Sequence, residues 1–347
     1  MPTIDDVARL AGVSKMTVSR VLNNSGYVKE STYKRIQQAI SDLKYRPNMV
    51  ARGLVTGRMH TLAHVMLDID DMIHSGINKG FEEECYKRGY NVLVCDANGK
   101  NRESKYINMI IDKKIDGAIF HHLDISEEQV EKMTAAGVKC VLIDNEYEIQ
   151  NTSNIVTDNY YGGQLAAEHL IKLGHTKIGC LYGVLNRPDR PDSEIDYIDT
   201  FQFNIWRERT RGFCDALKAH GLEINNDYFY QGDGTMEHGI RLARQTMNRI
   251  ISMEDRPTAI YCENDVMAMG ALNALLKLKL DLPGDMAIVG HDGLSIVDNL
   301  YPRLTTVVQP TYQIGKLAAK MLIDLIENES EVSNVKLSPF LRVGEST

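Results

Sequence analysis

The sequence contains no run of about 18 apolar residues, so we expect no segment that spans a membrane. The N-terminus lacks a basic region followed by an apolar stretch, which argues against a secretory signal and favours a cytoplasmic protein. No low-complexity tract is present, and a hydrophobic fraction of 43% excludes a mostly disordered chain. A length of 347 residues is too great for one ordinary core and predicts two or three domains.

The patterns of disulfides, metal sites and cofactors are also missing. Six cysteines are scattered without a C-x-x-C pair, and most lie in apolar stretches such as 139–143. They predict small buried side chains in a reducing compartment. His121-His122 and the pair His169 and His175 lack metal-ligand spacing, which favours structural histidines with satisfied hydrogen bonds. We therefore expect no metal and no cofactor.

Enzyme motifs are absent as well. Gly232-Asp233-Gly234 is followed by Gly239, which does not give the G-x-G-x-x-G spacing of a dinucleotide site. Neither a P-loop nor a G-x-S-x-G nucleophile motif occurs. We expect no catalytic residues and no enzyme, although a doubly wound fold alone does not decide this.

The net charge of −8 argues by itself against a nucleic-acid partner, but it averages two unlike parts. Residues 1–59 carry 10 basic and 4 acidic side chains, a balance of +6, and the remainder carries 29 basic and 43 acidic, a balance of −14. A basic head on an acidic body predicts a polyanionic partner for the head only. On charge alone, a solvated basic face of a small domain is the alternative.

The spacing of apolar residues in the head predicts short helices. Residues 4–11 form the first, Ser14 opens the second and residues 33–43 form the third. Gly12 lies in the turn between the first two, which is the arrangement of a helix-turn-helix. A further short helix is expected within 48–55.

The second helix of such a motif directs the side chains near its start into the major groove. Lys15, Met16 and Arg20 lie there, and an arginine can bond a guanine through two parallel hydrogen bonds. Short hydroxyl and amide side chains suit phosphate oxygens, which fix the register without reading the sequence. These side chains are Thr3, Thr17, Ser19 and Asn23.

From residue 62 onward, apolar runs alternate with amphipathic segments, which predicts parallel, doubly wound sheets with helices on both faces. The expected strands are 62–67, 91–95, 116–120, 139–143, 177–182, 258–262 and 286–290, and the expected helices include 75–88, 103–113, 207–220 and 263–279. A body of nearly 290 residues is long for one sheet, so we expect two similar lobes. An irregular polar stretch at 183–200 predicts a functional loop.

Ordered motifs resemble one family. The segments Thr3–Ser14, Thr17–Asn23, Tyr45–Asn48 and Ala51–Leu54 look like the lactose/galactose repressor (LacI–GalR) family. In the body the matching segments are Asp116–Ile119, Val141–Asp144, Asp158–Asn159, Glu168–Leu170, Leu173–His175, Arg209–Phe213, Asn264–Ala271, Val289–Asp292, Leu304–Val307 and Gln309–Pro310. The resemblance implies a body like a periplasmic sugar-binding protein, with two α/β lobes, three crossovers and a ligand in the cleft.

For the head, the resemblance implies a hinge helix that forms on operator DNA, pairs with that of a dimer mate and inserts Leu54 into the minor groove. Two residues depart from the family. Gly53 stands where the family commonly has a better helix former. Lys29 stands where the family usually has a serine that caps the third helix, so either Ser31 caps this helix or Lys29 contacts phosphate instead. The candidate DNA-binding residues are Thr3, Ser14, Lys15, Met16, Thr17, Ser19, Arg20, Asn23, Lys29, Ala51, Arg52 and Leu54.

For the body, the resemblance implies a polar effector site. Sugar hydroxyls suit carboxylate, guanidinium and amide partners. A solvated loop residue or a structural cap is the alternative at each position. The candidates are, first, Arg209, Asn264 and Asp292, then Asp144, His121 and Gln309, and finally His74 near the end of the first strand.

The segment before Arg209 predicts a further contribution to this site. Gly232-Asp233-Gly234 lacks the bulky residue that the family often places there, so a stacking platform is missing. Phe201, Phe203 and Trp206, the only tryptophan, lie in the insertion. We hypothesise that it supplies an aromatic wall to the effector site, with a surface excursion anchored by Trp206 as the alternative.

These observations predict an all-α helix-turn-helix head at 1–46, a hinge at 47–60 and a two-lobed α/β body at 61–347. The first lobe is expected at about 61–159 and 292–323, and the second at about 160–291 and 324–347. We expect a homodimeric, sequence-specific repressor of carbohydrate-utilisation genes that binds a near-palindromic operator. We expect a sugar to release it from this operator. The protein is expected to be cytoplasmic and to lie on the nucleoid when it is bound to the operator. The sequence shows no C-terminal heptad repeat, so a coiled-coil tetramer is not indicated. A regulator co-repressed by a purine or a phosphoprotein, and a soluble sugar-binding protein, are the alternatives.

Overall fold

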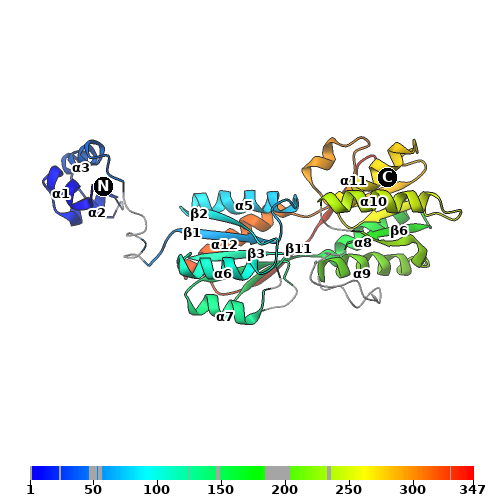
Figure 1. Ribbon diagram of the computed structural model, residues 1–347, viewed down its shortest axis with the longest axis horizontal. Helices are drawn as coiled ribbons and strands as arrows, with labels where there is room; N and C mark the ends of the chain where they lie inside the picture. The colour runs from blue at the N-terminus through cyan, green and yellow to red at the C-terminus, as the bar shows by residue number, and fades with distance from the viewer. Residues whose placement is uncertain are drawn as a thin grey trace. The chain divides into compact units, whose positions relative to one another are not determined.

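The computed structural model describes residues 2–22, 25–46, 53, 57–123, 125–145, 149–183, 204–232, 236–328 and 330–347. The chain divides into two compact units, a head of Met1–His60 and a body of Thr61–Thr347 (Figure 1). None of the helices in these ranges is both long and apolar enough to cross a membrane.

The head is built from three helices, α1 (Ile4–Ala11), α2 (Lys15–Leu22) and α3 (Glu30–Asp42). Thr3 and Asp6 form a capping box, in which the Thr3 hydroxyl accepts from the Asp6 N–H and the Asp6 carboxylate accepts from the Thr3 N–H. Such a cap contributes about 1 kcal/mol to helix stability. α1 ends at Gly12, whose φ of 64° is a left-handed conformation that suits glycine.

The three helices of the head enclose a small apolar core. Val7, Val18 and Ile36 are fully buried, one from each helix, and Ala8 is almost completely buried beside them. Burying an aliphatic side chain of this size contributes about 1.5–3 kcal/mol, so these few residues dominate the stability of the head. The packing of Ala8 and Val18 is the one that a helix-turn-helix requires.

The body contains two six-stranded sheets. The order of the first is β11-β5-β4-β3-β1-β2, and all its neighbouring strands are parallel. Its strands are β1 (Thr61–Met66), β2 (Asn91–Asp96), β3 (Gly117–His121), β4 (Lys139–Ile143), β5 (Ser153–Thr157) and β11 (Asn334–Leu337).

The second sheet has the order β12-β10-β9-β8-β6-β7, and only β12 is antiparallel to its neighbour. Its strands are β6 (Ile178–Tyr182), β7 (Phe229–Gln231), β8 (Ala259–Cys262), β9 (Ala287–Asp292), β10 (Thr305–Val308) and β12 (Phe340–Arg342). The central strands of both sheets are buried along their length, because helices cover both faces.

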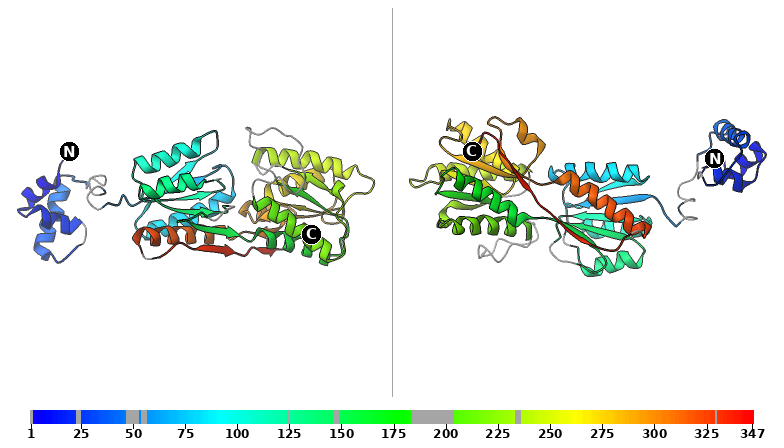
Figure 2. Two further views of the ribbon diagram at one scale, coloured as in Figure 1. Left: turned by 90° about the horizontal axis from the view of Figure 1, so that it is seen from below. Right: turned by 180° about the vertical axis from the view of Figure 1, so that it is seen from behind.

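Each sheet lies between two layers of helices (Figures 1 and 2). In the first lobe, α5 (Ile73–Lys87) and α12 (Thr311–Glu327) cover one face, and α6 (Arg102–Asp112) and α7 (Glu127–Ala135) cover the other. In the second lobe, α8 (Asn159–Lys172) and α9 (Asn204–Ala219) face α10 (Met236–Ile251) and α11 (Asp265–Lys277) across the sheet. The doubly wound, two-lobed fold class is therefore confirmed.

The lobe boundaries differ from those that the sequence predicted. β10 pairs with β9, so the chain returns to the first lobe between Val308 and Thr311 and not at residue 292. β11 pairs with β5, so the chain enters the second lobe only after Leu337 and not at residue 324. The assignment of 292–323 to the first lobe was thus wrong up to Val308 but right for α12, and that of 324–347 to the second lobe was wrong up to Leu337 but right for β12. Four-residue strands give no clear apolar run, and only their pairing shows which sheet they join.

The chain passes between the sheets at three places, and Figure 2 shows the last passage, from β11 to β12, in red. The lobes also touch. Ile73, at the start of α5 in the first lobe, is buried in the apolar cluster of the second lobe that contains Leu181 and Val266. Residues on both sides of the cleft are therefore held close to one another.

Several predictions lie outside the described residues. They concern Asn23, Ala51, Arg52 and Leu54 of the head, the helix expected within 48–55, and the insertion at 184–203 with Phe201 and Phe203.

Candidate functional sites

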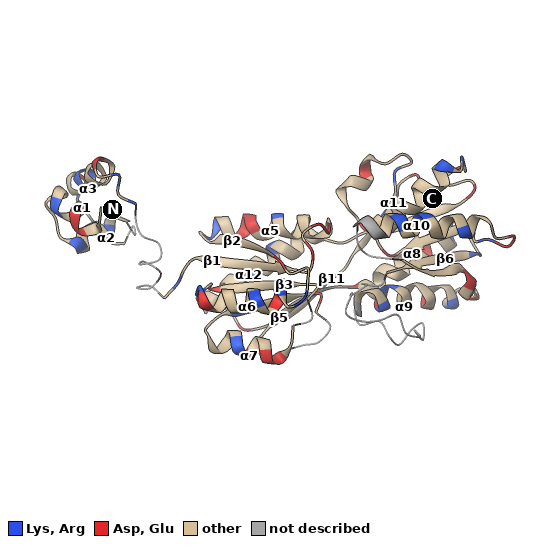
Figure 3. Cartoon of the chain, in the orientation of Figure 1, with Lys and Arg blue, Asp and Glu red and all other residues tan. Residues whose placement is uncertain are grey.

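One face of α2 carries the side chains expected to read DNA. Lys15, Met16 and Arg20 are exposed, and the Arg20 guanidinium lies 3.9 Å from the Met16 sulfur. Met16 is 66% exposed, which is high for an apolar side chain. Lys15 pairs with Asp5 at 3.0 Å across the start of the motif. Basic residues are distributed over all three helices of the head (Figure 3).

The short polar residues of the head have structural contacts of their own. The Thr17 N–H donates to the Ser14 hydroxyl at 3.2 Å, so Ser14 caps α2. Thr17 and Ser19 are half-buried, whereas Thr3 and Lys29 are exposed. Lys29 stands at the N-cap of α3 and makes no capping hydrogen bond through its side chain. Hydroxyls that cap a helix N-terminus lie beside its unpaired N–H groups, a site that suits a phosphate oxygen.

In the body, polar residues collect where the parallel strands of both sheets end. This edge is where open α/β sheets bind ligands. The second lobe contributes Glu263 and Asn264 after β8, Asp292 at the end of β9 and Gln309 after β10, and α9 contributes Arg209. All five are buried.

Arg209 is the centre of this group. Its Nε donates to the Asn159 side-chain oxygen at 2.8 Å, and its Nη1 donates to the Glu263 carbonyl at 2.5 Å and lies 3.2 Å from the Asp292 carboxylate. The guanidinium also lies over the Trp206 ring, with Cζ 5.1 Å from the centroid. A planar guanidinium held on several sides is preorganised for hydrogen bonding to a ligand.

Two glycines set the position of Arg209. A Cβ on Gly163 of α8 would collide with the Arg209 carbonyl, and a Cβ on Gly212 of α9 would collide with the Tyr160 carbonyl. The two backbones therefore approach one another as closely as glycine allows. The depth of Arg209 in the cleft depends on this packing of α8 against α9.

Asp292 is held in an unusual conformation. Its φ is 109°, a region that non-glycine residues rarely adopt and that costs about 1–3 kcal/mol. Gln309 donates to its carboxylate at 2.8 Å. Burial raises the pKa of Asp292 to about 6, although Arg209 acts in the opposite direction.

Glu263 lies behind Arg209 with no exposed surface. Its carboxyl accepts from the Gly183 N–H at 2.8 Å and lies 2.5 Å from the Thr210 hydroxyl. Burial raises the pKa of Glu263 to about 8, against the lowering effect of these hydrogen bonds and of Arg209. A carboxyl with this pKa is largely protonated at pH 7.

The first lobe faces the cleft with histidines and carboxylates. His74 and His121 are buried, with their Nδ1 atoms 2.6 Å apart. His121 and His122 lie 3.9 and 3.7 Å from one carboxylate oxygen of Asp144, measured from Nε2. Burial lowers the pKa of His74 and of His121 well below the usual value, so both rings are neutral. Burial raises the pKa of Asp71, which His122 and Arg209 lower.

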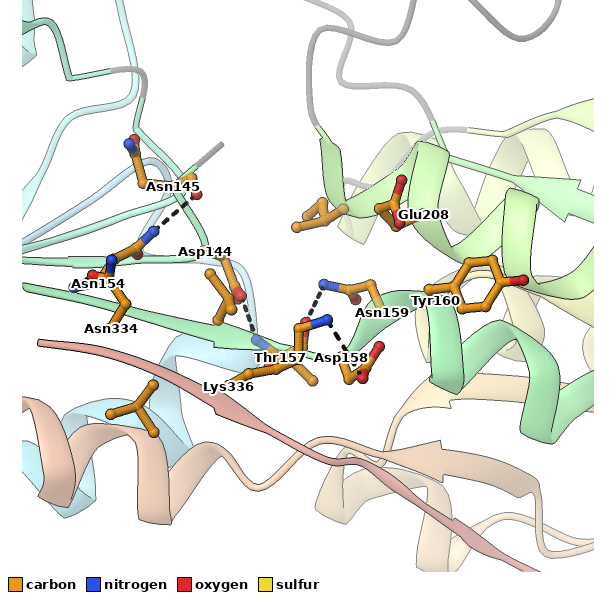
Figure 4. A pocket seen from close by; sticks show the side chains of 13 residues that line it. Asp144, Asn145, Asn154, Thr157, Asp158, Asn159, Tyr160, Glu208, Asn334 and Lys336 are labelled. Atoms are coloured by element: carbon orange, nitrogen blue, oxygen red, sulfur yellow. Dashed lines mark hydrogen bonds and ion pairs between the residues drawn. The ribbon is translucent and has the colours of Figure 1, made fainter. Parts of the chain in front are cut away.

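A cavity of about 360 Å³ opens at the β5–α8 crossover, and of the polar side chains described above only Asp144 and Asn159 line it. Asp144 and Asn154 line it from the first lobe, and Tyr160 and Glu208 line it from the second (Figure 4). Its walls are rich in carboxylates and amides, which suit a ligand with many hydroxyl groups.

Three of the predicted site residues have structural roles in addition. Asn264 caps α11 through its side-chain oxygen, which accepts from the Met267 N–H at 2.7 Å. Trp206 belongs to the apolar core of the second lobe, is only 6% exposed and packs against Gly183, so it anchors the insertion as well as lying under Arg209. His74 is buried beside His121 and does not line the cavity.

The structure also brings in residues that the sequence analysis missed. They are His64, Asp71, His122, Asn159 and Glu263. A usable signal existed for Asp71, Glu263 and His122, because each follows the end of a predicted strand, where a sheet binds ligands. Of the histidines expected to have satisfied hydrogen bonds, His169 and His175 have partners in Thr347 and Thr258, but the expectation was wrong for His121. The Nε2 atoms of His64, His74 and His121 have no hydrogen-bond partner in the described part of the chain.

Comparison with known proteins identifies the family. Residues 3–48 match the family of bacterial regulatory proteins of the lacI type, and residues 167–347 match a periplasmic binding protein-like domain. The HTH-type transcriptional repressor PurR of Aliivibrio salmonicida is 33% identical over 95% of this chain and 93% of its own length. The chain belongs to the LacI family. PurR of Photobacterium profundum is 32% identical over 100% of this chain and 98% of its own.

Solved structures of LacI-family regulators agree with this assignment. The complex of the transcriptional regulator CelR with cellobiose is 27% identical, covers 100% of both chains and has a TM-score of 0.70. The Lac repressor dimer bound to operator and the anti-inducer ONPF is 24% identical, covers 100% of this chain and 99% of its own, and shares the fold with a TM-score of 0.80. This LacI-family protein is a DNA-binding transcriptional repressor and not an enzyme.

Proposed function

We propose that this LacI-family repressor binds a near-palindromic operator as a homodimer and is released by a small sugar bound in the cleft of the body. The buried Arg209–Asp292 pair, with Asn159 and Gln309 on its flanks, carries the second part of the proposal. A fixed guanidinium beside a carboxylate matches the alternating donors and acceptors of vicinal hydroxyls. The similarity to the CelR–cellobiose complex supports a carbohydrate.

The effector is tested by isothermal titration of the full chain with pentoses, hexoses, their phosphates and purines. Arg209→Lys keeps the charge but loses the hydrogen bond from Nε to Asn159, and hydrogen bonds to charged groups contribute about 1.5–3 kcal/mol. We expect Arg209→Lys to bind the effector at least about 10-fold more weakly. Arg241→Lys on α10 of the same lobe, where Arg241 is exposed and does not line the cavity, is the control. Binding of a purine and of no sugar would make the proposal wrong.

For DNA, Lys15, Met16 and Arg20 are proposed to reach base edges and Leu54 to insert into the minor groove. The remaining DNA contacts are proposed for Thr3, Ser14, Thr17, Ser19, Asn23, Lys29, Ala51 and Arg52. Arg20→Ala is expected to cost about 1–3 kcal/mol of operator affinity and to relax specificity at one base pair. Lys34→Ala removes an equal charge from α3, where Lys34 pairs with Glu30 and is solvent-exposed, and is expected to change affinity little. Equal losses in the two variants would assign the effect of Arg20 to charge alone.

Operator and effector must influence one another equally. Coupling of about 1–3 kcal/mol is typical and corresponds to about 5- to 150-fold in affinity. If a sugar is the inducer, adding operator weakens sugar binding by the same factor as sugar weakens operator binding. Tighter sugar binding with operator present would show that the ligand is a co-repressor instead. Sedimentation of the full chain tests the homodimer.

A further inference from the structure

The first lobe gathers imidazoles and carboxylates where the strands of its sheet end. His64, His74 and His121 form one group of possible metal ligands, Asp71, His74 and His122 a second, and His121, His122 and Asp144 a third, with the ligand atoms of each group within 4.8 Å of one another. Only the second and third contain a carboxylate, which balances the charge of a divalent cation. The third group alone includes a residue that lines the cavity.

Strand register explains why the third group exists. β3 and β4 are parallel neighbours in which His121 pairs with Ile143, so His122 and Asp144 both follow at the same edge of the sheet. Both residues have left-handed backbones, with φ of 54° and 53°. Non-glycine residues in this region are strained, and such strain collects at functional sites.

The separations suit a metal ion. The Nε2 atoms of His121 and His122 lie 3.9 and 3.7 Å from the same Asp144 oxygen. An ion such as zinc, at about 2.0–2.2 Å from nitrogen and oxygen in tetrahedral geometry, holds its ligands about 3.4 Å apart. The two histidine–carboxylate separations therefore exceed this spacing by about 0.3–0.5 Å, and all three ligand atoms lie within 4.8 Å of one another.

Neighbouring groups already orient these ligands. The other Asp144 oxygen accepts from the Thr157 N–H at 2.9 Å, which directs the remaining oxygen toward the histidines. His74 contacts His121 through Nδ1 at 2.6 Å, so when the His121 Nδ1–H donates to His74, the His121 Nε2 lone pair is available. That Nε2 is fully buried and has no hydrogen-bond partner among the described residues.

We propose that His121, His122 and Asp144 bind one divalent transition-metal ion, of the zinc or cobalt class, at the wall of the effector cleft. Two imidazoles and a carboxylate are ligands that such ions accept, and three protein ligands leave a coordination position open. The His122 side chain is 11% exposed and Asp144 lines the cavity, so the ion has a path from solvent. This site does not depend on which effector the protein binds.

The test is titration of chelator-treated, dialysed full-length protein with Zn²⁺, followed by calorimetry, and with Co²⁺, followed by its visible absorption. The wild type is expected to bind one equivalent of Zn²⁺ per chain. His122→Asn removes one ligand while retaining a residue that tolerates the left-handed backbone. Because even groups that only orient a ligand are worth about 10- to 100-fold in metal affinity, His122→Asn is expected to lower affinity by about 100-fold or more.

Two controls separate this site from the rest of the protein. His175→Gln changes a histidine of the second lobe that contacts Thr258, and it is expected to bind Zn²⁺ like the wild type. Arg209→Lys is expected to retain Zn²⁺ affinity although it loses effector affinity, so a failure of the effector proposal leaves this result intact. The proposal is overturned if the wild type binds no Zn²⁺ at micromolar concentrations. It is equally overturned if His122→Asn, folded by circular dichroism, matches the wild type.

Discussion

The buried carboxyl of Glu263 makes a contribution to the free energy of unfolding that decreases as the pH rises. The Thr210 hydroxyl lies 3.1 Å from the Trp206 carbonyl and 2.5 Å from the Glu263 carboxyl. A hydroxyl has one hydrogen, so when Thr210 donates to Trp206, the short contact with Glu263 needs a proton on the carboxyl. The pKa of about 8 that burial gives Glu263 supplies that proton at neutral pH.

The direction in which the free energy of unfolding changes with pH follows from the number of protons bound by the folded and unfolded states. In the unfolded chain Glu263 releases its proton near the ordinary pKa of 4.5, whereas the folded protein keeps it up to about 8. Between these values the folded state binds more protons, so the free energy of unfolding decreases as the pH rises. Each pH unit corresponds to about 1.4 kcal/mol, which gives an upper limit of about 5 kcal/mol over the whole interval.

Glu263→Gln removes this dependence, because the glutamine amide donates to Thr210 without titrating and its oxygen accepts from Gly183. At pH 5 the variant is expected to match the wild type within about 1 kcal/mol. Between pH 5 and pH 8, the free energy of unfolding of the variant is expected to rise relative to that of the wild type by up to about 1.4 kcal/mol per pH unit. The other buried carboxyls are common to both proteins and cancel in the difference.

The measurement is urea unfolding of both full-length proteins from pH 5 to 9, followed by the fluorescence of Trp206, which lies next to Thr210. Glu223→Gln is the matched control, because it makes the same substitution at an exposed position of the same lobe. A difference between Glu263→Gln and the wild type that stays constant with pH would refute the reasoning, since it would mean that Glu263 is ionised in the folded protein.

Three further predictions concern other parts of the chain. Thr3→Ala removes the capping box and is expected to lower the stability of the head by about 1 kcal/mol, measured by thermal unfolding of α1–α3 with circular dichroism, and no change would show the cap to be dispensable. Gly163→Ala is expected to cost about 1–3 kcal/mol and to weaken effector binding by displacing Arg209, and unchanged affinity would contradict that positioning role. Effector affinity is expected to fall as the pH drops below about 6, where Asp292 becomes protonated, and Asp292→Asn should give weaker binding that does not change across this range.

The head could be predicted almost completely from sequence because its contacts are local. Val7 and Val18 lie in consecutive helices joined by a short turn, and the helical spacing of apolar residues predicts that both are core residues. The central strands of the body could be predicted because each is a continuous apolar run. The four-residue strands β10 and β11 were not, because such short segments acquire a place only through pairing with β9 and β5.

The candidate site could be predicted only in part. Family motifs single out Arg209, Asp292 and Gln309, which the structure brings together. The histidines could not be grouped from spacing, because His64 lies on β1, His74 on α5 and His121 at the end of β3. Parallel pairing of β1 with β3, with Met66 beside His121, brings these distant positions to one edge. A metal-ligand pattern that arises from sheet register leaves no short sequence motif.

The cleft is built so that a ligand can affect the arrangement of the lobes. Asp144 and His122 in the first lobe and Asp292 in the second all adopt left-handed backbones immediately after or at the end of a strand. Such conformations persist only where the surrounding structure compensates for their cost, which is about 1–3 kcal/mol each. A ligand that touches both sets binds best at one separation of the lobes, and it can shift that separation only by its difference in affinity for the two arrangements. Under the proposed function, interactions confined to one lobe are therefore expected to add affinity without a response. Interactions that bridge Asp144 and the Arg209–Asp292 pair are expected to couple effector to operator.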